Sequence, residues 1–312
     1  MAAMLLGFGV PVSGVWATPD HQVRLVRRAE ELGYRSAWTF QRLLVPAERE
    51  PDPRSGMEVY RSVLDPVVSL AHVAGHTSRI RLGVAVLNMP FFSPALMAKQ
   101  LATLDIVAGG RLDVGLGIGW SRVEFAASGV PYERRGARGE EFLRALGALW
   151  TDDQVEFHGA FYRIPPARMQ PKPVQRPCPP VLLGGSADPA LRRAGRLADG
   201  WISASNADLR HIDRPIATVR RAAAEAGRDP EALRFVCRGA VRVGPAGAGD
   251  RRPLTGSVEQ IRGDLDDLGV QGVTEVFLDL NWDPEIGSPD ADPAAALRRA
   301  EETLEALAPA GS

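Results

Sequence analysis

Few side chains in this sequence have the types and spacing that chemistry requires. Cys178 and Cys237 stand far apart and form no CxxC pair, which argues against a zinc site or a disulfide framework. His72 and His76 have the HxxxH spacing of a metal pair on a helix, but Val73 stands where a metalloprotease carries its glutamate. We therefore predict a structural role for the two histidines and no metal site.

Two glycine-containing segments are better candidates for binding. GLGIGW, at residues 115–120, lacks the GxGxxG spacing and the acidic partner of a dinucleotide-binding loop, so we do not expect a Rossmann site there. In LLGGSADPALRRA, Gly184 and Gly185 end a predicted strand. Ser186 or Asp188 can then cap a helix, and the free N–H groups at such a helix start attract phosphate. An ordinary turn with a good cap explains the same residues.

These candidates must be positioned by strands and helices that alternate along the whole chain. The apolar patterns predict strands over residues 5–12, 35–40, 80–87, 111–118, 181–184, 201–204, 235–243 and 273–280. They predict helices over residues 19–33, 62–74, 94–107, 137–150, 189–198, 209–226, 257–268 and 294–307. Strands such as VLLGG and VFLDL are apolar throughout, as in a parallel sheet buried on both faces. Uninterrupted βα repeats favour a closed (β/α)8 TIM barrel, an α/β fold, over a doubly wound open sheet.

The alternation is interrupted once, by a proline-rich stretch over residues 151–180. Within it, VEFHGAFYRI predicts a short hairpin and PKPVQRPCPP an extended connector. We predict one domain over residues 1–312, with an insertion at about 120–180.

The composition limits the partners of the chain. Its 312 residues are 45% apolar and 24% charged, which supports a large buried core. The formal net charge of −1 gives no reason to expect nucleic acid or an anionic membrane as a partner. The N-terminus has no basic region ahead of its apolar stretch, and no apolar run is long enough to span a bilayer. We expect a cytosolic protein that acts on a small molecule.

The C-terminal ends of barrel strands hold the active site in this fold, and here they are mostly small residues. They are residues 11–13, 39–42, 85–88, 117–120, 183–186 and 203–205. Small side chains leave an open volume and let a planar ring approach the backbone. With few acids, bases or nucleophiles present, such a site fits a cofactor that brings its own reactivity. The structural alternative is that these residues merely ease the turns from strand to loop.

Two long segments carry a family resemblance. RIRLGVAVLNMPFFSPALMAKQLATLDIVAGGRLDVGLGIGW resembles the most recognisable stretch of the luciferase-like monooxygenases, especially their coenzyme F420-dependent oxidoreductase branch. PKPVQRPCPPVLLGGSADPALRRAGRLADGWI is similar to the second signature of that family. The likeness extends from Leu5 to about Asp279. It implies a TIM barrel with a cap insertion around strands 4 and 5, in a family that is often homodimeric.

The resemblance also implies particular site residues. It implies a cis peptide between Ala85 and Val86, in a bulged third strand behind the central ring of the cofactor. The implied cofactor-binding positions are Ala85, Val86, Asn88, Ile118, Gly119, Leu183, Gly184, Gly185, Ser203 and Ala204. We expect Trp120 and His158 at the substrate pocket.

The sequence departs from the family pattern at two positions. Many F420 enzymes have Asp-His after the second strand, whereas this chain has Gln41 and Arg42, which we take as its catalytic candidates. Gln41 can hydrogen-bond the edge of the cofactor ring. Arg42 cannot act as a general acid, but it can stabilise negative charge or anchor a carboxylate, unless it forms a structural ion pair. Trp120 replaces a glutamate of the sugar-phosphate dehydrogenases, which makes that reaction improbable here.

We therefore predict hydride transfer between F420 and a small organic substrate such as an unsaturated carbonyl compound or an imine. The first alternative is an FMN-dependent monooxygenase that uses reduced flavin and oxygen. The second is a family member that binds a ligand without turnover. The acidic tail of F420 would find basic residues such as Arg134, Arg135 or Arg168 near the barrel mouth, unless these form only a solvated surface.

Overall fold

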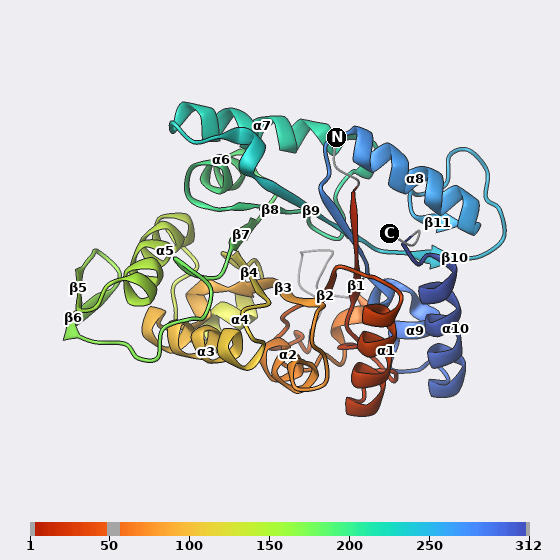
Figure 1. Cartoon of the computed structure of the whole chain (residues 1–312), viewed down its shortest axis with the longest axis horizontal. Helices are drawn as coiled ribbons and strands as arrows, with labels where there is room; N and C mark the ends of the chain where they lie inside the picture. The colour runs from red at the N-terminus through yellow and green to blue at the C-terminus, as the bar shows by residue number, and fades with distance from the viewer. Residues whose placement is uncertain (1–3, 49–56, 310–312) are drawn as a thin grey trace.

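A closed barrel of parallel strands forms the centre of the computed structural model, which describes residues 4–48 and 57–309 (Figure 1). The strands follow one another around the barrel in the order β1, β12, β9, β8, β7, β4, β3 and β2. Their bounds are β1 Leu5–Gly9, β2 Ser36–Thr39, β3 Arg81–Asn88, β4 Leu112–Gly117, β7 Val181–Gly184, β8 Gly200–Ile202, β9 Arg234–Gly239 and β12 Glu275–Leu278. Pairing of β1 with β12, from Leu5 opposite Glu275 to Phe8 opposite Leu278, closes the ring. The predicted TIM barrel is confirmed.

A helix follows each strand and covers the outside of the barrel. The main helices are α1 Pro19–Glu31, α2 Pro66–Ala74, α3 Pro94–Val107, α5 Arg135–Thr151, α6 Asp188–Leu197, α7 Asp213–Glu225, α8 Val258–Val270 and α10 Pro293–Ala306. Several begin with a capping side chain followed by proline. Proline is tolerated there because the N–H groups of the first helical turn have no intrahelical acceptor, so its missing N–H costs no hydrogen bond. These caps are Thr18, Asp65, Ser93 and Asp292. No helix in the described part of the chain is long and apolar enough to cross a membrane.

The barrel interior is filled by side chains from its own strands. Trp38, Ala85, Leu182, Ile202, Val236 and Phe277 form one buried cluster. Because these residues come from six strands of a closed ring, they meet inside it. The rings of Trp38 and Phe277 stack with centroids 5.4 Å apart. A Cβ at Gly83 would lie 2.3 Å from Cε3 of Trp38, so a glycine is needed beside this indole.

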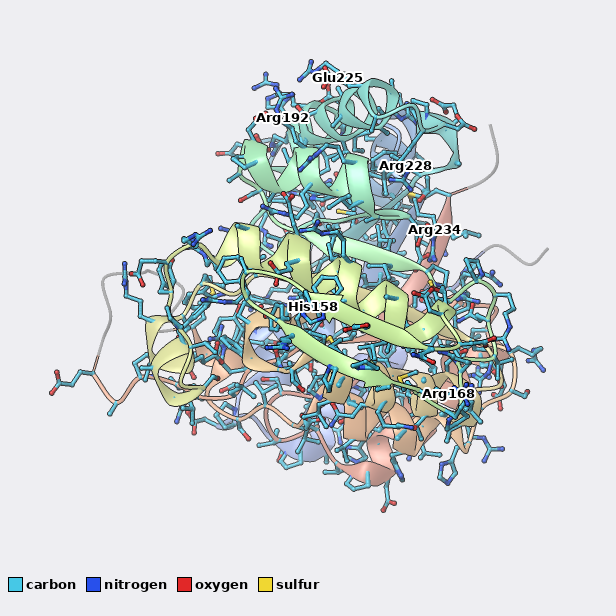
Figure 2. The ribbon with its side chains drawn as sticks, turned by 90° about the vertical axis from the view of Figure 1, so that its left-hand side faces the viewer. His158, Arg168, Arg192, Glu225, Arg228 and Arg234 are labelled. Carbon is cyan, nitrogen blue, oxygen red and sulfur yellow. The ribbon has the colours of Figure 1, made fainter. Side chains whose placement is uncertain are left out.

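A buried network of charges ties four strands together near their N-terminal ends. Asp113 in β4 is fully buried and pairs with Arg81 of β3 at 2.7 Å and with Arg234 of β9 at 2.8 Å. Arg234, which Figure 2 labels, also lies 3.0 Å from Glu275 of β12. Burial alone would raise the pKa of Asp113, but the hydrogen-bonded arginines outweigh it and hold that pKa below its ordinary value.

The insertion lies between β4 and β7. It contains α5 and the antiparallel hairpin of β5 Val155–His158 with β6 Arg163–Ala167, which confirms the predicted hairpin. It also contains α4, Arg122–Ala127, which was not predicted because six residues are too short to display a helical period.

Several predicted elements are shorter than expected, and two of them show a clear local feature. The helix predicted over 62–74 begins at Pro66, where the Asp65 side chain accepts hydrogen bonds from two backbone N–H groups. The strand predicted over 235–243 ends at Gly239. Its last residues form β10, Arg242–Val243, which pairs with β11, Thr255–Gly256, outside the barrel.

Replacing the buried carboxylate by an amide tests the charge network. Asp113→Asn keeps the shape of the side chain but leaves two arginines facing a neutral group, so we expect the free energy of unfolding to fall by about 3 kcal/mol at neutral pH. Because the folded-state pKa of Asp113 is depressed, its contribution is fully present above the ordinary carboxyl pKa of about 4 and is lost as the pH falls below it. Chemical denaturation across that range should show the two proteins converging in acid.

Asp266→Asn is the matched control, because Asp266 is exposed on α8 and forms no ion pair with a described residue. We expect it to change stability little. Equal losses in the two variants, or a wild-type stability for Asp113→Asn at neutral pH, would contradict a stabilising role for the network.

Candidate active site

A cavity of about 430 Å³ opens at the C-terminal ends of the strands. Its walls come from the ends of β2, β3, β4, β7, β8 and β9, with Tyr60 and the start of α5 at its side. Of the site residues predicted from the sequence, those that line it are Gln41, Arg42, Ala85, Val86, Asn88, Ile118, Gly119, Trp120, Gly184, Gly185, Ser203 and Ala204. The barrel therefore brings together predicted residues from the ends of five separate strands.

Two predicted residues lie elsewhere. Leu183 is 2% exposed and packs in the hydrophobic core, because strand alternation turns its side chain away from the face that Gly184 presents. His158 ends β5 on the outer hairpin, where Figure 2 shows it, and its exposed ring lies 2.8 Å from Glu156. The expectation that His158 belongs to the substrate pocket is therefore corrected.

The third strand forms one wall of the cavity. The peptide between Ala85 and Val86 is cis, as predicted, and the pairing register with β4 shifts between Val84 and Leu87. The side chain of Val86 then lies against two strand ends. A Cβ at Gly117 would come within 2.6 Å of Val86 Cγ2, and one at Gly184 within 3.1 Å of Val86 Cγ1. Only glycine fits at these two positions without displacing Val86, because the Val86 side chain occupies the space beside them.

Arg238 of β9 is a cavity residue that the sequence analysis missed. It is 6% exposed and donates a hydrogen bond to the carbonyl oxygen of Ala85. Its Nε lies 3.5 Å from Oδ2 of Asp279. Burial raises the pKa of Asp279, although Arg238 and Asn281 act in the opposite direction. A charged residue inside the otherwise apolar run FVCRGAV was the signal that could have found it.

Gln41 presents a donor to the cavity. Its Oε1 accepts a hydrogen bond from the backbone N–H of Asn88 at 2.9 Å, which fixes the amide. Its Nε2 is buried and has no hydrogen-bond partner. Ser203 differs, because its hydroxyl already accepts the N–H of Arg238 at 2.9 Å and lies 3.4 Å from Sγ of Cys237. Of these two predicted residues, Gln41 is the one whose buried side-chain donor, Nε2, is available to a ligand.

Arg42 is both a cavity residue and a member of a buried ion pair. It lines the cavity, and its Nη1 lies 3.1 Å from Oε2 of Glu124. This partner comes from α4. The guanidinium also lies against two aromatic rings, those of Tyr60 and Trp120, at 4.1 and 4.4 Å from their centroids.

Unpaired donors are concentrated in this cavity. Eight side-chain nitrogen or oxygen atoms of the described residues are buried without a hydrogen-bond partner, and four belong to side chains that line it. They are Gln41 Nε2, Arg42 Nε, Arg135 Nε and Arg238 Nε. A buried donor without an acceptor is destabilising, so four in one place indicate a ligand rich in acceptors. No described residue of the lining carries a carboxylate, which favours an anionic ligand.

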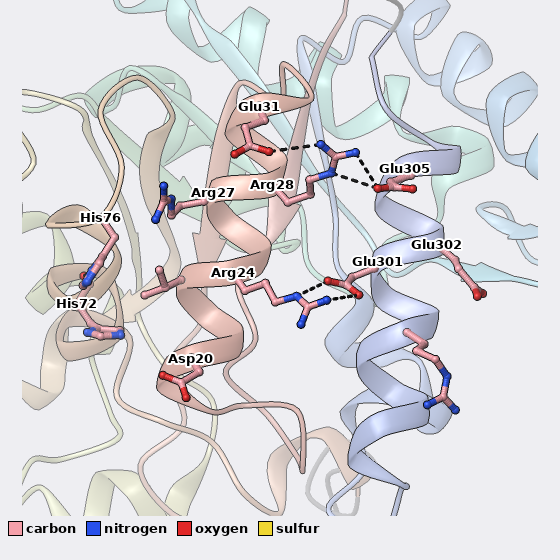
Figure 3. A pocket seen from close by; sticks show the side chains of 12 residues that line it. Asp20, Arg24, Arg27, Arg28, Glu31, His72, His76, Glu301, Glu302 and Glu305 are labelled. Carbon is pink, nitrogen blue, oxygen red and sulfur yellow. Dashed lines mark hydrogen bonds and ion pairs between the residues drawn. The ribbon is translucent and has the colours of Figure 1, made fainter.

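A second hollow, of about 830 Å³, lies outside the barrel between α1, α2 and α10 (Figure 3). Ion pairs such as Arg24 with Glu301 and Arg28 with Glu305 cross it, and the arginines are exposed. His72 and His76 stand at its edge, where each ring bonds a backbone carbonyl oxygen. The described residues contain no group of three or more side chains able to hold a metal ion. The barrel cavity, which gathers the buried unpaired donors, is therefore the candidate active site.

The chain matches the family described as luciferase-like monooxygenase over residues 4–252, and it belongs to that family. Members of the family are flavin- or F420-dependent oxidoreductases and monooxygenases, so the chain is an enzyme of that class. An uncharacterised protein of Mycobacterium tuberculosis is 37% identical over 212 residues, which are 66% of this chain and 72% of that protein. The FMNH2-dependent dimethylsulfone monooxygenase of Pseudomonas putida is 40% identical over 164 residues, 51% of this chain and 45% of that protein.

Solved structures share the fold over nearly the whole chain. The monooxygenase RslO1 of Streptomyces bottropensis has a TM-score of 0.78 at 23% identity, covering 97% of this chain and 98% of that one. An F420-dependent secondary alcohol dehydrogenase, solved with an F420-acetone adduct, has a TM-score of 0.75 at 16% identity, covering 97% and 99%. At these identities the likeness establishes the fold alone.

Gly117→Ala tests whether the space around Val86 is needed for cofactor binding. The new methyl group would push the Val86 side chain toward the cavity, so we expect the affinity for a flavin or deazaflavin to fall by about tenfold, as for other overpacked sites. Fluorescence quenching during cofactor titration measures this affinity.

Gly147→Ala in α5 is the control, because nothing lies within 4 Å of the added Cβ and alanine favours a helix. If a folded Gly117→Ala protein bound the cofactor as tightly as the wild type, the space beside Val86 would not belong to the cofactor site.

Proposed function

We propose that this enzyme is an F420-dependent oxidoreductase that transfers a hydride between the deazaflavin and a small organic substrate. The observation that carries the proposal is the cavity of unpaired donors at the strand ends, lined by three arginines and by no described acidic side chain. A cofactor with ring carbonyl groups and several negative charges supplies the acceptors that this cavity lacks.

The residues present fit such a cofactor. The Gln41 amide, held by the N–H of Asn88, keeps its buried Nε2 donor unpaired, and this donor would hold an acceptor of the ring. The turn at Gly184 and Gly185 leads into α6, whose N-cap residue Ala187 makes no side-chain hydrogen bond. The start of α6 is therefore suited to the phosphate of the cofactor side chain.

Each part of the site then has a task. When bound, F420 supplies a hydride to the substrate or takes one from it. Gln41 and the strand-end backbone would orient the ring, and Val86, at the end of β3, would support it. Phe40, Tyr60 and Trp120 provide an apolar wall that excludes water from the reacting atoms.

A group of arginines beside the cavity supports F420 over FMN. Four arginines near the start of α5 stack on Tyr132 or Phe161, with Cζ atoms 4.0 to 5.1 Å from the ring centroids. They are Arg122, Arg134, Arg135 and Arg138. None of them forms an ion pair with a carboxylate in the described ranges, and Arg135 lines the cavity. The acidic tail of F420 extends past its phosphate and can meet these charges, whereas FMN ends at its phosphate. Arg168, the third basic residue expected at the mouth, is exposed beyond β6 (Figure 2).

One observation favours a second candidate, an FMN-dependent monooxygenase. The relative of known activity with 40% identity is FMNH2-dependent, although the matched segment is less than half of that protein. The donors of the cavity would serve a flavin ring equally well, so the arginines near α5 are the feature that separates the two candidates.

Parallel titrations with F420 and FMN test the choice. We expect F420 to bind more tightly and its affinity to fall as the salt concentration rises, because exposed charges are screened. In Arg134→Ala/Arg138→Ala, the Kd for F420 should rise by about fivefold, since each exposed contact contributes at most about 1 kcal/mol, while the Kd for FMN should stay unchanged.

Arg214→Ala is a suitable control, because Arg214 is exposed on α7 and does not line the cavity. Tighter binding of FMN, with turnover that requires oxygen and reduced flavin, would establish the second candidate. Cofactor binding without turnover on any carbonyl or imine substrate would favour a ligand-binding role.

A further inference from the structure

Arg42 lies in a corner between two aromatic rings at one side of the cavity. Its Cζ is 4.1 Å from the ring centroid of Tyr60 and 4.4 Å from that of Trp120. Because the two centroids are 6.1 Å apart, they subtend roughly a right angle at Cζ. The rings therefore hold the guanidinium from two sides and do not sandwich it, which leaves part of its surface for another flat group.

Glu124 fixes the guanidinium in this corner. Its Oε2 lies 3.1 Å from Nη1 of Arg42, and its Oε1 accepts the backbone N–H of Leu43 at 2.7 Å. The side chains of the pair are only 6% and 3% exposed. Because one carboxylate oxygen is committed to the backbone, the pair has little freedom to rearrange, and Arg42 is held ready in one orientation.

The unpaired donors of Arg42 lie along one edge of the guanidinium. Nε and Nη2 form this edge, and Nη1, the atom that meets Glu124, is not part of it. Nε is buried without a hydrogen-bond partner, and no described residue accepts a hydrogen bond from Nη2. Two parallel N–H groups on such an edge match the two oxygens of a carboxylate.

We propose that Arg42 anchors the substrate through a carboxylate, and that the substrate is a planar, unsaturated carboxylic acid whose flat body lies against Tyr60 and Trp120. This inference rests on the proposed function, because it names the substrate class of the same cavity. No described acidic side chain of the lining repels such an anion. A cationic or wholly apolar substrate would instead leave the buried Nε donor unpaired.

The other two arginines of the cavity are placed differently. Arg238 has its Nε facing Asp279 and donates to the backbone of Ala85. Arg135 stacks on Tyr132 at the start of α5, near the exposed arginines. Of the three, Arg42 alone is held by a carboxylate at Nη1 while its Nε–Nη2 edge makes no hydrogen bond with a described residue.

Binding of trans-cinnamate and of cinnamamide, measured by calorimetry with and without F420, tests the proposal. The two compounds have the same shape, but only cinnamate carries a carboxylate. We expect cinnamate to bind more tightly by at least about tenfold. Arg42→Lys keeps a charge opposite Glu124 but loses the planar fork, so it should weaken cinnamate binding by about tenfold and leave cinnamamide within about twofold.

Glu124→Gln should weaken cinnamate binding as well, because Arg42 then loses the group that orients it. Arg24→Lys, at the exposed pair with Glu301, is the matched control and should change neither ligand. Equal binding of cinnamate and cinnamamide, or equal binding of cinnamate by wild type and Arg42→Lys, would overturn the proposal. So would a loss of F420 affinity in Arg42→Lys as large as the loss for cinnamate, since Arg42 would then be a cofactor residue. Failure of the wild type to bind F420, with cinnamate binding intact, would instead count against the proposed function alone.

Discussion

Closure of the barrel is the constraint on which the rest of the structure depends. Closure gives each strand a hydrogen-bonded neighbour on both sides. Because all eight strands are also parallel, their C-terminal ends share one rim. Gln41 and Arg238 are far apart in the sequence, yet the pairing of β1 with β12 brings their strands onto the same ring. The cavity therefore exists because of the topology, and no single segment could form it alone.

The two ends of this barrel bury charge in opposite ways. At the N-terminal end, Arg81 and Arg234 both hydrogen-bond the carboxylate of Asp113, and neither arginine has a buried donor without a partner among the described residues. At the C-terminal end, Arg42 and Arg238 also lie near carboxylates, yet their Nε atoms have no hydrogen-bond partner. Satisfied charges stabilise the fold, whereas unsatisfied donors mark where a ligand completes the structure. That contrast within one barrel distinguishes a structural network from a binding site.

The sequence predicts the barrel well because apolar strands and capped helices carry local signals that periodicity detects. It predicts the wall positions less completely, because contacts across the barrel leave no local trace. Arg238 lies inside a strand, and Glu124 lies on a helix too short to show a period, so neither was assigned to the site. His158 was misplaced because nothing in a proline-rich insertion indicates which face of its hairpin turns outward.

The departure from the family pattern after β2 is consistent with the chemistry of the whole cavity. A guanidinium remains charged at neutral pH and cannot release a proton, so Arg42 contributes positive charge where many F420 enzymes carry an ionisable pair. The described lining also contains no histidine, lysine or carboxylate. A site of this kind stabilises negative charge on substrate oxygens electrostatically and leaves proton transfer to hydroxyl groups or water. Under the proposed function, Gln41 and Arg42 would therefore bind an anion at the position where many F420 enzymes carry Asp-His.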